Sequence, residues 1–349
     1  MTTIVEKYAG STLGKPFADL LDEFLSQPVD PDASMRINAK VLPQGRYKER
    51  APRTTKPKAI KVSDEAISAV SALVSDEDIF TRPNGDKYHA RKWGEHQDVA
   101  TLRKAREATA YTFASSAGAP MFTLLYGAPG CGKTALVEAA FGENMYTLLG
   151  TGDTEVADLL GGYVQTPSGG FEWVDGDLVK AAEEGAVYFI DEVGLIDPKV
   201  LSIIYGLMDG RREISITANP ERGTVKADPN FYVVAATNPN APGVRLSEAL
   251  LSRFTVQAEM ATDWSLARTL GVPTSMVTVA QNLSKKQVSG EVSWAPQMRE
   301  LLAFRDISTV FGLSFAVSNL LAASPEIDRP VVADVLSRVF GSDCKPAKI

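Results

Sequence analysis

The sequence is poor in the side chains that hold metal clusters or cross-link small domains. Its 349 residues include two cysteines and two histidines. Cys131 and Cys344 lie far apart along the chain, and the histidines are His89 and His96. Zinc sites and disulfide frameworks need several such residues at short spacing. The counts give no basis for either, so we expect a reducing, cytoplasmic environment.

Long hydrophobic runs are also missing. No apolar stretch approaches the roughly 20 residues that a membrane-spanning helix needs. The chain begins Met-Thr-Thr-Ile-Val-Glu, which lacks the charged and then apolar order of a signal peptide. Hydrophobic residues make up 44% of the chain and charged residues 23%, as in ordinary globular proteins. We therefore expect a protein without a membrane partner.

The chain has no excess of positive charge. Its formal net charge is −7 and its pI is about 5.1. Proteins that grip nucleic acid without sequence preference usually present a basic face. The overall charge therefore argues against nucleic acid as the main partner.

Residues 46–61 are a local exception to this acidic balance. Pro52 and Pro57 lie among the basic residues, and Glu49 is the only acid in the segment. The composition is typical of a flexible basic linker, and a docking or nucleic-acid-binding arm is the alternative. The basic residues are Arg46, Lys48, Arg50, Arg53, Lys56, Lys58 and Lys61.

Residues 127–134 form the most informative motif. They read Gly-Ala-Pro-Gly-Cys-Gly-Lys-Thr, follow a strand-like apolar run at 121–126 and precede a helix-forming run at 135–140. This is the phosphate loop of nucleotide-binding proteins in the context that it needs. Backbone N–H groups and a helix N-terminus bind the phosphates. The predicted nucleotide-binding residues are Gly127, Ala128, Pro129, Gly130, Cys131, Gly132, Lys133, Thr134 and Ala135.

Two of these residues have more specific expected roles. Lys133 supplies a cation for the β- and γ-phosphates of ATP, and Thr134 supplies a hydroxyl ligand for Mg²⁺. A Gly-rich strand-to-helix turn without a ligand is the alternative interpretation of the motif.

A pair of acids follows a second apolar run. Residues 186–190 read as a buried strand that leads into Asp191 and Glu192. The carboxyl ends of strands are where open α/β sheets bind their ligands. We expect Asp191 to hold Mg²⁺ and Glu192 to orient the attacking water. An ordinary strand end capped by acids is the alternative.

Two further candidates come later in the chain. Residues 232–236 form another apolar run, and Asn238 follows it, where it is expected to reach the γ-phosphate or the attacking water. Phosphoryl transfer also needs positive charge at the γ-phosphate, often from a neighbouring subunit. Arg253 is the candidate for that role. A surface arginine that closes a helix is its alternative.

With these motifs in order, the chain from about Tyr88 to its end resembles the AAA+ ATPases, in particular the MoxR-like branch and its cobaltochelatase small-subunit relatives. The resemblance implies an α/β core with a central parallel sheet and β-hairpin insertions, followed by a small α-helical lid domain. The core motifs that carry it lie at 127–134, 158–161, 176–179, 191–192, 237–239 and 252–254. The C-terminal motifs lie at 298–301, 311–312, 328–332 and 338–341.

The resemblance also implies further site residues. An arginine at the place of Arg299 reaches the γ-phosphate from the lid, although residues 293–297 depart from the family pattern by a proline and extra residues. A helix-surface arginine is the alternative. Tyr88, His89 and Trp93 precede the first core helix and either contact adenine or form a packed aromatic cluster.

Alternating residues on either side of turn sequences predict two β-hairpins. One runs from Tyr163 to Val174 around a Thr-Pro-Ser-Gly-Gly turn, and the other spans residues 212–226. The resemblance places both at the pore of a ring. Phe171 and Trp173 on the first hairpin either grip a substrate or pack against their own domain.

The chain is thus expected to have three parts. Residues 1–75 form an N-terminal extension, 76–262 the nucleotide-binding core and 263–349 the helical lid. Individual helices are expected at 17–25, 63–73, 98–114, 297–310, 311–321 and 330–340.

The predicted function is ATP hydrolysis by a homo-oligomeric ring, expected to be hexameric, that remodels a protein client or assists metal or cofactor insertion. The resemblance adds a partner with a von Willebrand A-type domain. A nucleic-acid motor or restriction-type NTPase and a nucleotide-gated scaffold are the alternatives. The acidic charge weighs against the first, and the presence of Glu192, Asn238 and Arg253 weighs against the second.

Overall fold

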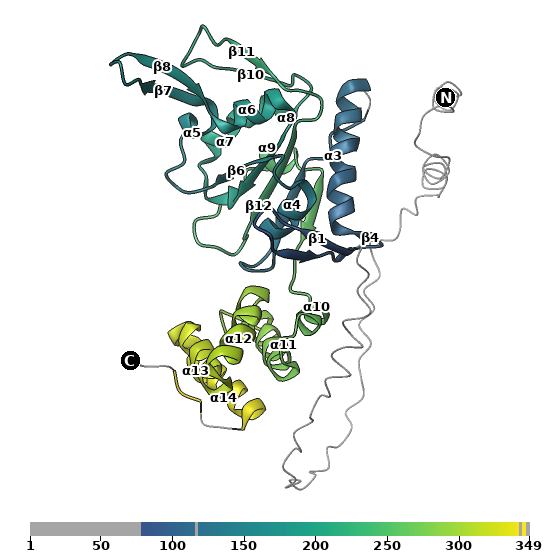
Figure 1. Cartoon of the computed structure of the whole chain (residues 1–349), viewed down its shortest axis with the longest axis vertical. Coiled ribbons are helices and arrows are strands. Elements are labelled where there is room, and N and C mark those ends of the chain that lie inside the picture. The colour runs from purple at the N-terminus through teal and green to yellow at the C-terminus, as the bar shows by residue number, and fades with distance from the viewer. Residues whose placement is uncertain (1–77, 116–117, 342–343, 347–349) are drawn as a thin grey trace, which may run out of the picture. The chain divides into compact units, whose positions relative to one another are not determined.

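The structure is a computed structural model of the chain (Figure 1). All the residues that it describes belong to one compact unit, Lys61–Ile349. The described residues are 78–115, 118–341 and 344–346. The helices predicted at 17–25 and 63–73 and the basic linker at 46–61 lie outside them.

A five-stranded sheet forms the centre of the first part, in the order β13-β5-β12-β9-β6. Every pair of neighbours in it is parallel. The predicted α/β core with a parallel sheet is therefore confirmed. The strands are β5 (Thr123–Tyr126), β6 (Met145–Leu149), β9 (Val187–Asp191), β12 (Tyr232–Thr237) and β13 (Val256–Glu259).

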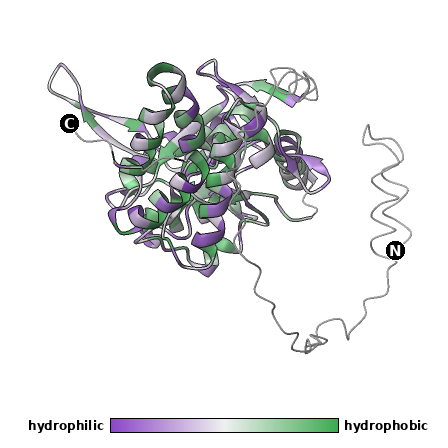
Figure 2. Cartoon of the chain, turned by 90° about the horizontal axis from the view of Figure 1, so that it is seen from below, coloured by the Kyte–Doolittle hydropathy of each residue, from purple (hydrophilic) through white to green (hydrophobic). Residues whose placement is uncertain are grey.

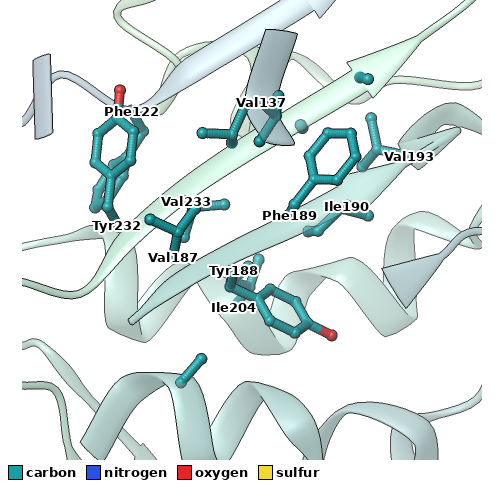
Figure 3. Packing of buried hydrophobic residues seen from close by; sticks show 14 of the residues in the cluster. Phe122, Val137, Val187, Tyr188, Phe189, Ile190, Val193, Ile204, Tyr232 and Val233 are labelled. Carbon is teal, nitrogen blue, oxygen red and sulfur yellow. The ribbon is translucent and has the colours of Figure 1, made fainter. Parts of the chain in front are cut away.

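The middle strands are covered on both faces. All six residues of β12 and the first four of β9 are buried. Parallel strands covered on both faces are apolar throughout, which explains the unbroken hydrophobic runs in the sequence. Neighbouring residues point to opposite faces, so Phe189 lies toward Val137 while Tyr188 lies toward Ile204 (Figure 3).

The helices of the chain carry both hydrophobic and hydrophilic residues (Figure 2). The longer helices are α3 (Asp98–Ser115), α4 (Lys133–Phe141) and α6 (Asp177–Glu184). Of these, α3 and α6 bury only some of their residues. The short ones are α5 (Val156–Leu160), η3 (Val193–Leu195), α7 (Pro198–Leu201), η4 (Ser202–Ile204), α8 (Tyr205–Met208) and α9 (Glu248–Leu251).

Both predicted hairpins are present (Figure 1). The first pairs β7 (Gly161–Gln165) with β8 (Phe171–Asp175), and the second pairs β10 (Glu213–Ser215) with β11 (Thr224–Lys226). Arg222, in the turn of the second hairpin, makes an ion pair of 3.1 Å with Asp175 at the end of the first. It makes another of 2.6 Å with Glu183 on α6. The turn of the second hairpin is therefore joined to the base of the first.

Two small strand pairs precede α3, and the sequence did not predict them. β1 (Ile79–Thr81) pairs with β2 (Lys87–His89), and β3 (Lys92–Trp93) pairs with β4 (His96–Gln97). Strands of two or three residues are too short to leave a periodic pattern.

The C-terminal part is helical and has its own hydrophobic core, in which Phe304 and Phe340 stack with ring centroids 6.1 Å apart. The helices predicted after residue 296 are confirmed with shifted ends. The elements are α10 (Trp264–Thr269), α11 (Thr274–Val288), α12 (Met298–Phe311), α13 (Leu313–Ala323), η5 (Glu326–Asp328) and α14 (Arg329–Phe340). Among the described residues, no helix is both long and apolar enough to cross a membrane.

The base of the first hairpin yields a stability prediction. Gly161 has φ +105°, and a Cβ there would lie 2.1 Å from the carbonyl oxygen of Val174. Gly161→Ala must therefore displace backbone, and we expect it to lower the free energy of unfolding by about 2 kcal/mol. The neighbouring Gly162 has open space at its Cβ position, so Gly162→Ala should change stability by no more than about 0.5 kcal/mol. Urea unfolding of both variants measures the difference, and equal midpoints contradict the assignment.

Candidate active site

The order of the strands brings the predicted site residues to one edge of the sheet. β12 lies between β5 and β9, with Thr237 opposite Tyr126 and Ala235 opposite Ile190. Neighbouring strands are about 4.8 Å apart, so the segments after them are close neighbours. The phosphate loop (residues 127–134) follows β5, Asp191 ends β9 with Glu192 directly after it, and Asn238 follows β12.

The phosphate loop is attached directly to the neighbouring strand. The N–H of Gly127 donates to the carbonyl of Thr237 at 3.2 Å. A Cβ at Gly127 would lie 2.2 Å from the carbonyl oxygen of Met260, so only glycine fits there. Helix α4 begins at Lys133, and no described side chain caps its N-terminus. The N–H groups of its first turn therefore face the loop and favour an anion.

Lys133 is the cation inside this loop. Its side chain is buried, and its ammonium donates to the carbonyls of Gly127 at 2.8 Å and Ala128 at 3.2 Å. Among the described residues, no carboxylate pairs with it. The ammonium therefore lies next to the N-terminus of α4 without a described anionic partner, which is the arrangement that a polyphosphate requires.

Thr134 and Asp191 meet across the sheet edge. The Thr134 hydroxyl donates to Oδ2 of Asp191 at 2.7 Å, and Oδ1 of Asp191 accepts from the N–H of Glu192 at 3.0 Å. Within the described ranges, no group of three or more His, Cys, Asp or Glu residues is placed to hold a metal. Mg²⁺ does not need such a group, because it commonly binds one or two protein oxygens together with water and substrate phosphates. The donor set of Thr134 and Asp191 fits Mg²⁺ in that mode.

Glu192 has an unusual backbone conformation. Its φ of 52° and ψ of 40° lie in the left-handed region. Among the described non-glycine residues, Arg212 is the only other one with a positive φ. A non-glycine residue there costs roughly 1 kcal/mol, and such strain is concentrated at functional sites. The conformation turns the chain sharply after Asp191, so two consecutive acids leave the strand in different directions.

Asn238 is fixed by a local turn. Its Oδ1 accepts from the N–H of Asn240 at 3.2 Å, which is the geometry of an Asx turn. The side-chain NH₂ makes no hydrogen bond with a described residue. Asn238 directly follows β12, and its contact with the γ-phosphate or the attacking water stays a prediction.

The two arginines are placed differently. Arg299 lies in the first turn of α12, and its backbone N–H donates to the carbonyl of Gly130 in the phosphate loop at 3.3 Å. A Cβ at Gly130 would be 2.9 Å from the Cβ of Arg299. Arg253 follows α9 instead, where Nη1 donates to the carbonyl of Ala249 at 2.6 Å. Among the described contacts, none joins Arg253 to the phosphate loop of its own chain.

The sequence analysis missed Arg91, which connects the phosphate loop to the segment before α3. Its Nη1 donates to the carbonyl of Cys131 at 2.9 Å. Its Nε and Nη2 donate to the Tyr88 hydroxyl at 3.2 and 3.1 Å, and Nε lies 3.6 Å from Oδ2 of Asp98. Nothing in the sequence marks Arg91, because its partners come together only in the fold.

The three aromatic residues that were expected near adenine lie in different surroundings. Tyr88 is buried and donates to Asp98 at 2.5 Å, and burial raises the pKa of its hydroxyl well above the usual range. This favours the packed alternative for Tyr88. Burial also lowers the pKa of the half-buried His89. Trp93 instead lines a cavity of about 380 Å³ next to Arg91.

That cavity lies beside the phosphate loop and mixes apolar and polar walls, as small-molecule pockets do. Leu136 from the helix after the loop and Met260 after β13 supply apolar surface. Arg91 and Asp263 supply charge. Adenine binding at Trp93 stays a prediction.

Comparison with known proteins agrees with this geometry. Residues 123–254 match the AAA domain (dynein-related subfamily). Uncharacterized proteins of Staphylococcus epidermidis and Staphylococcus aureus are each 30% identical over 226 residues, or 59% of this chain and 85% of the relative. Protein NorQ of Paracoccus denitrificans is 36% identical over 130 residues, or 36% of this chain and 47% of NorQ. The chain belongs to the AAA family, whose domain generally binds and hydrolyses nucleotides.

The role of Arg91 can be tested by removing its charge. Arg91→Met leaves the carboxylate of Asp98 buried without its cation and the Cys131 carbonyl without its donor. We expect the free energy of unfolding to fall by about 3 kcal/mol. Lys92→Met, at an exposed neighbour, should change it by less than about 0.5 kcal/mol. Urea unfolding measures both, and similar values for the two variants would disprove the assigned network.

Proposed function

We propose that this protein is an ATPase of the MoxR-like type that hydrolyses Mg²⁺-bound ATP at the carboxyl edge of its sheet. The observation that carries the proposal is the 2.7 Å contact between Thr134 and Asp191, which pairs a phosphate-loop hydroxyl with a carboxylate. Hydroxyl and carboxylate oxygens beside a buried lysine form the ligand set of phosphoryl-transfer sites. The match of residues 123–254 to the AAA domain supports the same chemistry.

Each residue has a proposed part in the reaction. Lys133 and the N–H groups of the first turn of α4 bind the phosphates, and Thr134 and Asp191 hold Mg²⁺. The bound ion would neutralise charge that develops on the phosphates. Glu192 accepts a hydrogen bond from the attacking water and orients it. Asn238 donates its NH₂ toward the same water or the γ-phosphate.

The two arginines supply the remaining positive charge. The N-terminus of α12 touches the loop at Gly130, so Arg299 is proposed to act on the nucleotide of its own chain. Arg253 has no contact with that loop among the described residues, so it is proposed to act on the nucleotide of a neighbouring copy. Activity would then require a ring, and we propose a hexamer.

The first hairpin is proposed to contact a protein client. Phe171 is 70% exposed, whereas Trp173 is half-buried, packs on the core and donates from Nε1 to Asp175 at 2.7 Å. Trp173 also makes an edge-to-face contact with Tyr163 at 5.3 Å. The two aromatics therefore have different parts: Trp173 holds the hairpin, and Phe171 meets the client.

The client itself is proposed from the C-terminal motifs. Their likeness to the cobaltochelatase type supports metal or cofactor insertion or remodelling of a protein client, together with a partner that carries a von Willebrand A-type domain. A Glu192→Gln chain that binds ATP but does not turn it over should retain that partner, and affinity capture with ATP followed by mass spectrometry would identify it.

Hydrolysis should depend on the carboxylate of Glu192. Glu192→Gln keeps the size of the side chain but loses the base that orients water, so turnover should fall at least about 100-fold. Affinity for Mg²⁺-bound ATP should stay near that of the wild type. Glu143→Gln, at an exposed acid after α4, is the control and should keep full activity. A steady-state phosphate-release assay decides, and a wild-type rate in Glu192→Gln refutes the role.

The different proposed roles of Phe171 and Trp173 predict different results when each is replaced by alanine. Phe171→Ala should leave the melting temperature and basal ATPase unchanged but abolish stimulation by the client. Trp173→Ala should destabilise the protein by about 3 kcal/mol, as expected for a packed aromatic. Thermal melts and ATPase assays on both variants separate the two roles. Strong destabilisation by Phe171→Ala would show that the Phe171 side chain packs against its own domain and does not serve to contact the client.

A further inference from the structure

Arg253 lies against an aromatic ring of its own chain. Its guanidinium carbon is 4.1 Å from the ring centroid of Tyr205, which begins α8. A guanidinium over a tyrosine face is held by the ring quadrupole, and the attraction grows when water is excluded. The contact joins two segments that lie far apart in the sequence.

Among the described residues, no carboxylate forms an ion pair with Arg253. One nitrogen, Nη1, donates to the carbonyl of Ala249, and Nε is buried without a hydrogen-bond partner among the described residues. Asp209 is the acid in its neighbourhood, but its carboxylate is already bonded to Arg211 at 2.8 and 3.2 Å. The hydrogen bonds from Arg211 hold the pKa of Asp209 low, and the charge of Arg253 adds to this effect.

Tyr205 is itself fixed to the element that carries Arg253. Its hydroxyl lies 2.9 Å from Oγ of Ser247. The same Ser247 oxygen caps α9 by accepting from the N–H of Leu250. Tyr205, Ser247 and Arg253 are thus connected around α9. The aromatic face of Tyr205 holds the guanidinium by a contact that does not neutralise its charge.

We propose that Tyr205 is a positioning residue that holds Arg253 in place for the γ-phosphate of the neighbouring subunit. This inference rests on the proposed role of Arg253 in the ring. A carboxylate would fix the same side chain by cancelling its charge, whereas an aromatic face leaves the hydrogen-bond donors at the guanidinium edge available to phosphate oxygens. The ring also limits the rotamers of a long side chain before the phosphate arrives, which lowers the entropic cost of the contact.

The first test compares Tyr205→Phe with Tyr205→Leu. Tyr205→Phe keeps the aromatic face and should retain the wild-type kcat within about twofold. Tyr205→Leu removes the face, and we expect kcat to fall about tenfold, which corresponds to about 1.4 kcal/mol, with the KM for ATP unchanged. Tyr205→Met, with an unbranched side chain, replaces Tyr205→Leu if the latter does not fold. Equal rates in the aromatic and aliphatic variants overturn the proposal.

Mixed rings separate a positioning role from a structural one. Tyr205→Leu subunits keep an intact phosphate loop, and Lys133→Ala subunits keep an intact Tyr205 and Arg253. Their mixture should therefore regain ATPase activity. In addition, Tyr205→Leu combined with Arg253→Ala in one chain should be no slower than Arg253→Ala alone. No recovery in the mixture, or a further loss in the double variant, shows that Tyr205 does not act through Arg253.

A parallel mixture tests the role of Arg253 itself. Arg253→Ala and Lys133→Ala subunits should also complement each other if the arginine acts in a neighbouring copy. If this mixture does not recover ATPase activity while size-exclusion chromatography shows assembled rings, the role of Arg253 in a neighbouring copy is wrong. The inference about Tyr205 is then wrong as well. If this pair recovers but the Tyr205→Leu mixture does not, only the inference about Tyr205 is wrong.

Discussion

The hydrogen bond between Thr134 and Asp191 is the contact on which the site depends, because it joins the phosphate loop to the strand that carries the acids. It forms because β12 holds β5 and β9 at a fixed register on either side of it. The buried apolar runs of these strands set that register, so the packing of the core determines the position of the two side chains that we propose as Mg²⁺ ligands. A slip of one residue would turn each side chain to the other face of the sheet and separate the pair.

The phosphate loop is also held from outside the sheet. The guanidinium of Arg91 bonds the carbonyl of Cys131, and the first turn of α12 bonds the carbonyl of Gly130. These contacts come from the segment before α3 and from the C-terminal helices, so three parts of the chain meet at one loop. A change in the loop on nucleotide binding therefore has a direct physical route to both flanking parts.

The sequence predicted the elements whose signals are local. The helix after residues 127–132, the buried strand before the two acids and both hairpins were predicted correctly, because each is encoded by consecutive residues. Arg91, and the stacking of Arg253 on Tyr205, were not predicted, since their partners lie far away in the chain. For Tyr88 and Trp93, only the fold distinguishes a buried tyrosine from a tryptophan that lines a cavity. The predicted roles of Asn238, Arg253 and Arg299 depend on a nucleotide and a second subunit, and remain proposals.

The central claim is that this sheet edge binds a nucleotide through Lys133 and Mg²⁺. Calorimetric titration of ATPγS into the full chain, with and without Mg²⁺, tests it most directly when wild type is compared with Lys133→Ala. We predict Mg²⁺-dependent binding by the wild type and an affinity at least about 100-fold lower in Lys133→Ala, or about 2.7 kcal/mol. Equal affinities for the two proteins, or binding by the wild type that does not change when Mg²⁺ is removed, would contradict the account.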